Sequence, residues 1–199
     1  MTPLAELLAT PGVIEEHRIA GPVGIMAFHG GSLERMTDVI LDAVAARCDA
    51  STYVVRQPMG FRWHVPSREF DPADSWRLAE FLDHVDVAIA LHGFGRHGLY
   101  TTLLAGGSNR TLAHHLARHI TEHLPDYSVP TELDDIPIEL RGLHEDNPVN
   151  RTRHGGVQLE LPPRVRGIGP FWAAEEDAPG FRPHTISLID SLVAAINTW

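Results

Sequence analysis

The sequence predicts an α/β fold, with a single open, mostly parallel mixed sheet and helices on both faces. Short apolar runs of strand length alternate along the chain with longer segments whose apolar residues recur every three or four positions. Glycine and proline bound the apolar runs, as turns between elements require. Strands that alternate with helices form a largely parallel sheet, and the length suits one domain, residues 1–199.

The first half of the chain supplies two strands and two helices. An apolar run at residues 23–28 ends before a His-Gly-Gly turn, which predicts a buried strand. Residues 35–47 carry apolar side chains at helical spacing. Residues 52–56 predict a second strand. A second helix is expected at residues 74–83, with Asp74 as its N-cap.

The second half repeats the alternation. Residues 86–91 form an apolar run that again ends in a His-Gly pair, and residues 109–124 carry an apolar stripe typical of a helix. Residues 156–161 alternate between apolar and polar side chains, which predicts a strand. The last helix is expected at about residues 184–197. The stretch 162–183 is rich in proline and glycine and is expected to be a long surface connection.

Composition narrows the class of function. The 26 acidic and 16 basic residues give a formal net charge of −10, which disfavours binding to nucleic acid or to anionic membranes. No run approaches the roughly 20 apolar residues of a membrane span. Residues 1–12 lack the basic start and apolar run of a secretory signal, so we expect a cytoplasmic protein. The single cysteine, Cys48, cannot form an internal disulfide or a thiolate zinc site.

Two predicted strands end in histidine. His29 begins a short turn that leads to Glu34, and His92 follows another strand. Ligands of open α/β sheets bind at the carboxyl ends of the strands, where these residues would meet. Two histidines and one glutamate are a known ligand set for catalytic zinc. The alternative is a pair of unrelated turn histidines, each packed and hydrogen-bonded.

Covalent catalysis is disfavoured. A His-Gly-Gly sequence also forms the oxyanion hole of some serine esterases, but those enzymes need a G-x-S-x-G nucleophile elbow, which this sequence lacks. Cys48 falls within a predicted helix, away from any strand end, so it is a poor candidate for a nucleophile.

A carboxylate interrupts the last predicted strand. Val157, Leu159 and Leu161 would share one face, which leaves Gln158 and Glu160 on the other. Burying a carboxylate is costly unless it has a partner or a task. Glu160 is therefore a candidate functional residue, and the alternative is an edge strand whose polar side chains face solvent.

The order of these motifs resembles the poly-gamma-glutamate hydrolase family of bacteria and phages, over roughly residues 20–165. The shared pattern consists of His-Gly-Gly-x-x-Glu, a strand ending His-Gly, a Gly-Gly pair before a helix, Asn-x-x-Asn-Arg, and Gly-Val-Gln-Leu-Glu. A further segment, His64-Val65-Pro66-Ser67 with Phe70-Asp71-Pro72, is similar to the family's pattern except that Pro66 replaces threonine. Ser108 stands where the family often has aspartate.

The resemblance implies a zinc-dependent amidohydrolase with a core like that of the zinc carboxypeptidases. By that match His29, Glu34 and His92 would bind Zn²⁺, and Glu160 would be the general base. The four residues between His29 and Glu34 agree with the hydrolase family rather than with the His-x-x-Glu spacing of the carboxypeptidases.

An anionic substrate needs cationic or amide anchors. Arg96, Arg110, Asn150 and Arg151 lie beside the key motifs, and arginine binds carboxylates in a bidentate manner. The alternative for the arginines is ordinary surface charge. His64 would either line the substrate pocket or satisfy a local hydrogen bond.

A second histidine cluster needs a separate explanation. His115, His119 and His123 recur every four residues, so they share one helical face and could capture a metal ion. They lack a nearby glycine turn and an acidic base, and we interpret them as a partly exposed helix face.

The leading hypothesis is a zinc hydrolase that cleaves an amide bond next to a carboxylate, such as the γ-glutamyl bond of poly-gamma-glutamate. A second hypothesis is a related amidase or carboxypeptidase-like enzyme that acts on a small acylated amino acid. The third is a metal- or ligand-binding module without turnover, against which the carboxylate of Glu160 argues, because a binding site needs no general base.

Overall fold

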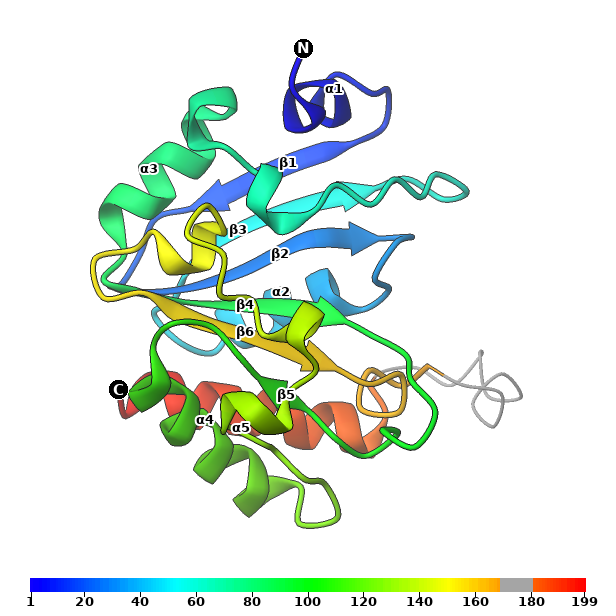
Figure 1. Cartoon of the computed structure of the whole chain (residues 1–199), viewed down its shortest axis with the longest axis vertical. Coiled ribbons are helices and arrows are strands. Elements are labelled where there is room, and N and C mark those ends of the chain that lie inside the picture. Colours follow the sequence, from blue (N-terminus) through cyan, green and yellow to red (C-terminus); the bar gives the residue numbers. More distant parts are fainter. Residues whose placement is uncertain (169–180) are drawn as a thin grey trace.

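The computed structural model describes residues 1–168 and 181–199. A six-stranded sheet in the order β1-β3-β2-β4-β6-β5 runs through the molecule (Figure 1). The four central strands are parallel, and the two edge strands are antiparallel to their neighbours. The strands are β1 (Ile14–Arg18), β2 (Val23–Gly31), β3 (Ser51–Gln57), β4 (Val87–Gly93), β5 (Leu104–Ala105) and β6 (Gly156–Leu161).

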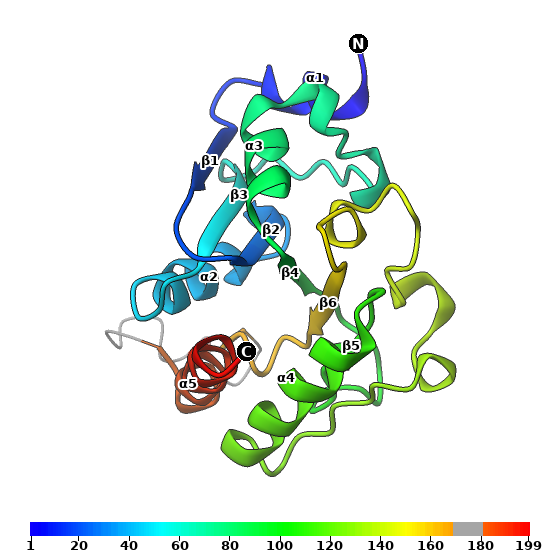
Figure 2. The same cartoon turned by 90° about the vertical axis from the view of Figure 1, so that its left-hand side faces the viewer.

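Helices cover both faces of the sheet. Figure 2 shows α2, α4 and α5 on one face, with α1 and α3 on the other. The α-helices are α1 (Pro3–Leu8), α2 (Thr37–Ala45), α3 (Trp76–His84), α4 (Arg110–His123) and α5 (Pro183–Asn197). Short 3₁₀ turns are η1 (Ser67–Glu69), η2 (Pro72–Asp74), η3 (Leu133–Asp135), η4 (Ile138–Leu140) and η5 (Pro148–Asn150).

Each face of the sheet has its own hydrophobic core. Side chains that alternate along a strand point to opposite faces, so Ile25 and Ile89 pack beneath α2, α4 and α5. Met26 and Tyr53 belong to the second core, with Phe81 of α3. The central strands β2 and β4 are therefore buried on both sides, which explains why their sequences are almost uniformly apolar.

The predicted fold class is confirmed. All four predicted strands and all four predicted helices are present, with ends that differ by a few residues. One helix cap was wrong: Ser75, not Asp74, caps α3. The Ser75 backbone is extended, and its hydroxyl accepts a hydrogen bond from the Leu78 amide. Asp74 ends η2, and its carboxylate instead accepts a hydrogen bond from the Thr2 hydroxyl.

Three elements were not predicted, α1, β1 and β5. The polar sequence of β1, Ile-Glu-Glu-His-Arg, gives no clear apolar alternation, because this edge strand is only half covered. β5 has two residues, too few for a pattern. Within the predicted connection 162–183, residues 169–180 lie outside the described part of the chain. None of the helices in the described ranges is long and apolar enough to cross a membrane.

Candidate functional site

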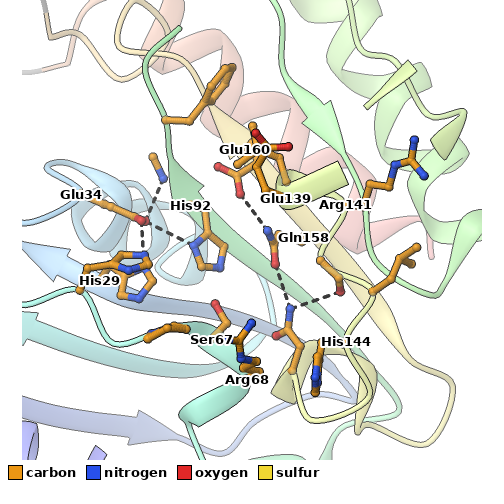
Figure 3. A pocket seen from close by; sticks show the side chains of 18 of the residues that line it. His29, Glu34, Ser67, Arg68, His92, Glu139, Arg141, His144, Gln158 and Glu160 are labelled. Atoms are coloured by element: carbon orange, nitrogen blue, oxygen red, sulfur yellow. Dashed lines mark hydrogen bonds and ion pairs between the residues drawn. The ribbon is translucent and has the colours of Figure 1, made fainter. Parts of the chain in front are cut away.

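A cavity of about 860 Å³ opens at the carboxyl ends of β2, β4 and β6. It lies on the sheet face opposite α2, α4 and α5, and segments after β3 and before η5 form its walls (Figure 3). The side chains in its lining that can ionise or form strong hydrogen bonds are His29, Glu34, His64, Ser67, Arg68, His92, Glu139, Arg141, His144, Asn147, Gln158 and Glu160.

An irregularity in β2 directs His29 into this cavity. Strict alternation from Ile25 and Ala27 would place His29 on the opposite face, with the α2 core. The register between β2 and β3 shifts between Ala27 and Gly30, and the His29 ring instead lies close to those of His92 and Phe70. Bulges commonly redirect side chains beside functional sites.

His29, Glu34 and His64 form a compact group in which one donor atom from each side chain lies within 4.8 Å of the others. His29 Nδ1 is 2.8 Å from Glu34 Oε1, and the rings of His29 and His64 are 4.6 Å apart. Glu34 can reach His29 because their backbones form a tight turn, in which the Glu34 amide donates to the His29 carbonyl at 2.8 Å.

His92 lies on the other side of Glu34. Its Nδ1 is 3.4 Å from Glu34 Oε2, the oxygen that also accepts a hydrogen bond from the Gly93 amide at 2.9 Å. His92 Nε2 is buried and has no hydrogen-bond partner within residues 1–168 and 181–199. Figure 3 shows both His29 and His92 directed at the Glu34 carboxylate.

The local charges keep Glu34 ionised. Burial acts to raise the pKa of Glu34, but the charges of His29 and His92 and their hydrogen bonds outweigh it, so this pKa lies well below its usual value. Burial and the nearby His29 lower the pKa of His64, which favours the neutral imidazole. Burial alone would lower the pKa of His92, but Glu34 and Glu160 raise it.

The donor set fits a zinc ion. One carboxylate and two imidazoles are a common set for catalytic zinc. His29 Nε2 lies 2.8 Å from the Val65 carbonyl, and Nδ1 faces Glu34. A histidine that binds a metal through one nitrogen usually donates the other N–H to such a carbonyl. The group therefore has both the ligands and the outer support of a metal site.

Glu160 lies beside His92 in the register of the two neighbouring strands β4 and β6. It is only 3% exposed, and burial raises its pKa, with the charge of His92 acting in the opposite direction. Gln158 Nε2 donates to Glu160 Oε1 at 2.8 Å, and Asn147 Nδ2 donates to Gln158 Oε1 at 2.9 Å. This chain of amides fixes the orientation of the carboxylate.

The four residues expected to anchor the substrate lie outside the cavity lining. Arg96 pairs with Glu139, and the Arg110 guanidinium donates to the carbonyls of Gly107, Ala105 and Thr131. Arg151 faces Asp71, with 3.7 Å between the charged atoms.

Asn150 supports the cavity wall instead of lining the cavity. Its side-chain amide donates to the carbonyls of Gly142 and His144 at 2.7 and 2.9 Å. Its Oδ1 accepts from the Ser108 amide. Because Gly142 and His144 line the cavity, Asn150 fixes the shape of one wall.

Arg68 is one of two arginines in the cavity lining, with Arg141, that the sequence analysis did not identify. It lines the cavity beside Ser67, and no described carboxylate lies within ion-pair distance of it. The one feature of the sequence that points to Arg68 is its position directly after the His64-Val65-Pro66-Ser67 segment. The irregular path of that segment cannot be deduced from periodicity.

The histidine cluster of α4 lies away from the cavity. His115 Nε2 is 2.9 Å from the Ala195 carbonyl, and His119 Nε2 is 3.1 Å from the Thr198 hydroxyl. His123 bonds back to the His119 carbonyl. These contacts join α4 to the end of α5. Within the described ranges the single three-residue group with metal-site geometry is that of His29.

Solved structures share this fold. The structure of a bacteriophage poly-gamma-glutamate hydrolase matches with a TM-score of 0.79 and 21% identity, covering 97% of this chain and 93% of the phage chain. YNDL in its zinc-free form matches with a TM-score of 0.75 and 19% identity, over 94% and 89% of the two chains. The N-acetylmuramoyl-L-alanine amidase AmiC2 of Nostoc punctiforme gives 0.51 and 11%, over 90% and 97%.

No curated protein matches the sequence significantly. The sequence model of poly-gamma-glutamate hydrolase, by contrast, matches residues 5–168, most of the chain. That span contains β2, β4 and β6, together with the cavity at their ends. The chain therefore belongs to the poly-gamma-glutamate hydrolase family.

Proposed function

We propose that this protein is a zinc-dependent hydrolase that cleaves the γ-glutamyl amide bonds of poly-gamma-glutamate. The observation that carries the proposal is the meeting of the His29, Glu34 and His64 group with the buried carboxylate of Glu160 in one cavity. Family membership supports the substrate, and the zinc-free form of YNDL supports the choice of metal.

His29, Glu34 and His64 would hold the ion. When bound, zinc supplies a Lewis acid that polarises the amide carbonyl and makes water a better nucleophile near neutral pH. The alternative third ligand is His92, as the sequence resemblance implies. We favour His64 because one donor atom from each of His29, Glu34 and His64 lies within 4.8 Å of the others. His92 also contacts Glu34, with 3.4 Å between Nδ1 and Oε2, and stays the alternative.

Glu160 would act as general base and then as general acid. Its carboxylate accepts a proton as the water oxygen bonds to the amide carbon, and it delivers that proton to the leaving nitrogen as the C–N bond breaks. The raised pKa of Glu160 suits both steps, because a base works best when its pKa approaches the working pH. Gln158 Nε2 holds Oε1 of the Glu160 carboxylate in place through a hydrogen bond.

Arg68 would recognise the substrate. In poly-gamma-glutamate the side-chain carboxyl forms the amide, so every residue keeps a free α-carboxylate. A guanidinium without an ionic partner in the described structure, on the wall of the cavity, matches that group. Within a chain of net charge −10, such a local cation is needed to hold an anionic polymer.

Arg68→Ala should raise KM by about tenfold or more with little change in kcat, because a charged hydrogen bond contributes roughly 1.5 kcal/mol or more. Steady-state kinetics on a short γ-glutamyl oligomer measures both constants. Arg151→Ala, whose guanidinium faces Asp71, is the matched variant and should change KM less. A larger effect at Arg151 would instead support the anchor expected from the sequence.

The proposed activity can be tested with two polymers of equal charge. Purified protein with zinc should shorten poly-gamma-glutamate, seen as a loss of polymer mass and a gain of free amino groups. Polyglutamate with ordinary α-linkages should remain intact. Cleavage of small acylated amino acids in preference to the polymer would favour the second enzymatic hypothesis. Zinc binding without cleavage of any amide would favour a binding module.

A further inference from the structure

Arg166 is a buried arginine just after β6. Its side chain is 7% exposed, and its guanidinium donates to three backbone carbonyls. Nη1 donates to the Arg35 carbonyl at 2.8 Å, Nε to the Leu161 carbonyl at 3.1 Å and Nη2 to the Phe94 carbonyl at 3.3 Å.

The three accepting carbonyls belong to three of the segments that carry the site. Arg35 follows Glu34 directly, Leu161 follows Glu160, and Phe94 comes two residues after His92. These segments are far apart in sequence, and one rigid, planar group connects the ends of all three.

A glycine lets the Arg166 guanidinium lie close to the backbone of β4. A Cβ atom at position 93 would lie 2.6 Å from Arg166 Nη1, so the guanidinium fits against the strand end because that residue is glycine. The amide of the same residue, Gly93, donates to Glu34 Oε2. Arg166 therefore packs directly behind the hydrogen bond that connects Glu34 to β4.

Its charge also has no direct ionic partner. No carboxylate of the described residues lies within ion-pair distance of Arg166, and burial lowers its pKa while the more distant Glu34 and Glu160 counteract that effect. Burying a cation without a paired anion is unfavourable. A merely structural connection could be made with neutral donors at lower cost.

We propose that Arg166 is a positioning residue for the metal centre, holding the segments of Glu34, His92 and Glu160 in mutual register through its three hydrogen bonds. The proposal deepens the proposed function and rests on it, since the centre it orders is the proposed zinc site. Arg166 acts through the backbone, from behind the cavity that the substrate would enter.

Three variants test the proposal. Arg166→Met removes the donors and the charge, and Arg166→Lys keeps the charge but cannot reach three carbonyls. Arg18→Met is the control, because Arg18 donates to the carbonyls of Ala45 and Ala50 at the opposite end of the sheet. Amide hydrogen exchange of the zinc-free protein and zinc affinity against a competing chelator are measured on each.

In Arg166→Met we expect the Gly93 amide to exchange at least tenfold faster, and zinc to bind about 10- to 100-fold more weakly, as is typical when outer support of a metal site is lost. Arg166→Lys should recover only part of the affinity. Arg18→Met should leave both quantities near those of the wild type. If Arg166→Met fails to fold, Arg166→Lys against Arg18→Lys makes the same comparison.

Wild-type zinc affinity and Gly93 exchange in Arg166→Met would overturn the proposal, as would full recovery by lysine. The exchange measurement needs neither metal nor substrate, so it remains decisive if the protein cleaves no γ-glutamyl bond. A failure of the proposed function is thereby distinguished from a failure of the role of Arg166.

Discussion

Glu160→Gln is expected to fold normally, to bind zinc as the wild type does and to cleave poly-gamma-glutamate about 10²- to 10⁴-fold more slowly. Glutamine keeps the size of the side chain, and its amide oxygen can still accept the hydrogen bond from Gln158 Nε2. What it loses is the capacity to take a proton. Single-turnover rates with saturating substrate would measure the loss directly.

Zinc content and thermal unfolding separate this effect from a structural one. A carboxylate that only stabilises the fold would, on substitution, lower the unfolding temperature and leave turnover intact. Glu139→Gln is the matched control, since Glu139 lines the same cavity but is exposed and paired with Arg96. Normal turnover in Glu160→Gln with zinc in place would remove Glu160 from the mechanism.

His64→Ala should abolish stable zinc binding, and with it nearly all activity. A site with two remaining protein ligands loses most of its affinity, because catalytic zinc is generally held by three. His29→Ala should behave in the same way. Elemental analysis after dialysis against zinc-free buffer gives the stoichiometry, which we expect to fall from about one ion per chain to near zero.

His92→Ala decides between the two ligand sets. If His92 only supports Glu34, the variant keeps its zinc with an affinity reduced by roughly tenfold or more. Complete loss of zinc in His92→Ala, with retention in His64→Ala, would restore the set implied by the sequence resemblance. Replacing the three histidines of α4, His115, His119 and His123, should change neither stoichiometry nor activity, since they contact the end of α5.

The features that the sequence predicts correctly are those that depend on periodicity or on short spacing along the chain. The central strands and main helices follow from apolar patterns, and the proximity of His29 to Glu34 follows from the turn that joins them. Glu160 is a candidate in the sequence because burying a carboxylate on an apolar strand is costly, but its role as general base is implied only by the family resemblance.

The positions of residues that are far apart in sequence but meet at the cavity were harder to predict. His64 and Arg68 lie in an irregular segment after β3, where side-chain direction depends on tertiary contacts such as the hydrogen bond between His29 and the Val65 carbonyl. The expected anchors, such as Arg96 and Arg110, were chosen by their nearness in sequence to motifs. In the structure Arg96 pairs with Glu139 and Arg110 donates to backbone carbonyls such as that of Ala105. No sequence pattern indicates these contacts.

The register that places His92 opposite Glu160 has a consequence for how such an enzyme could change its specificity. Neighbouring strands are held about 4.8 Å apart by their backbone hydrogen bonds, so the separation of these two positions is a property of the sheet itself. The walls that carry Arg68 and His144 come from connecting segments, which tolerate insertion and replacement far better than strands do. Transplanting the segment that carries His144 from a relative should therefore change the preferred polymer. The segment of Arg68 would have to be kept, because it also carries His64, a proposed metal ligand.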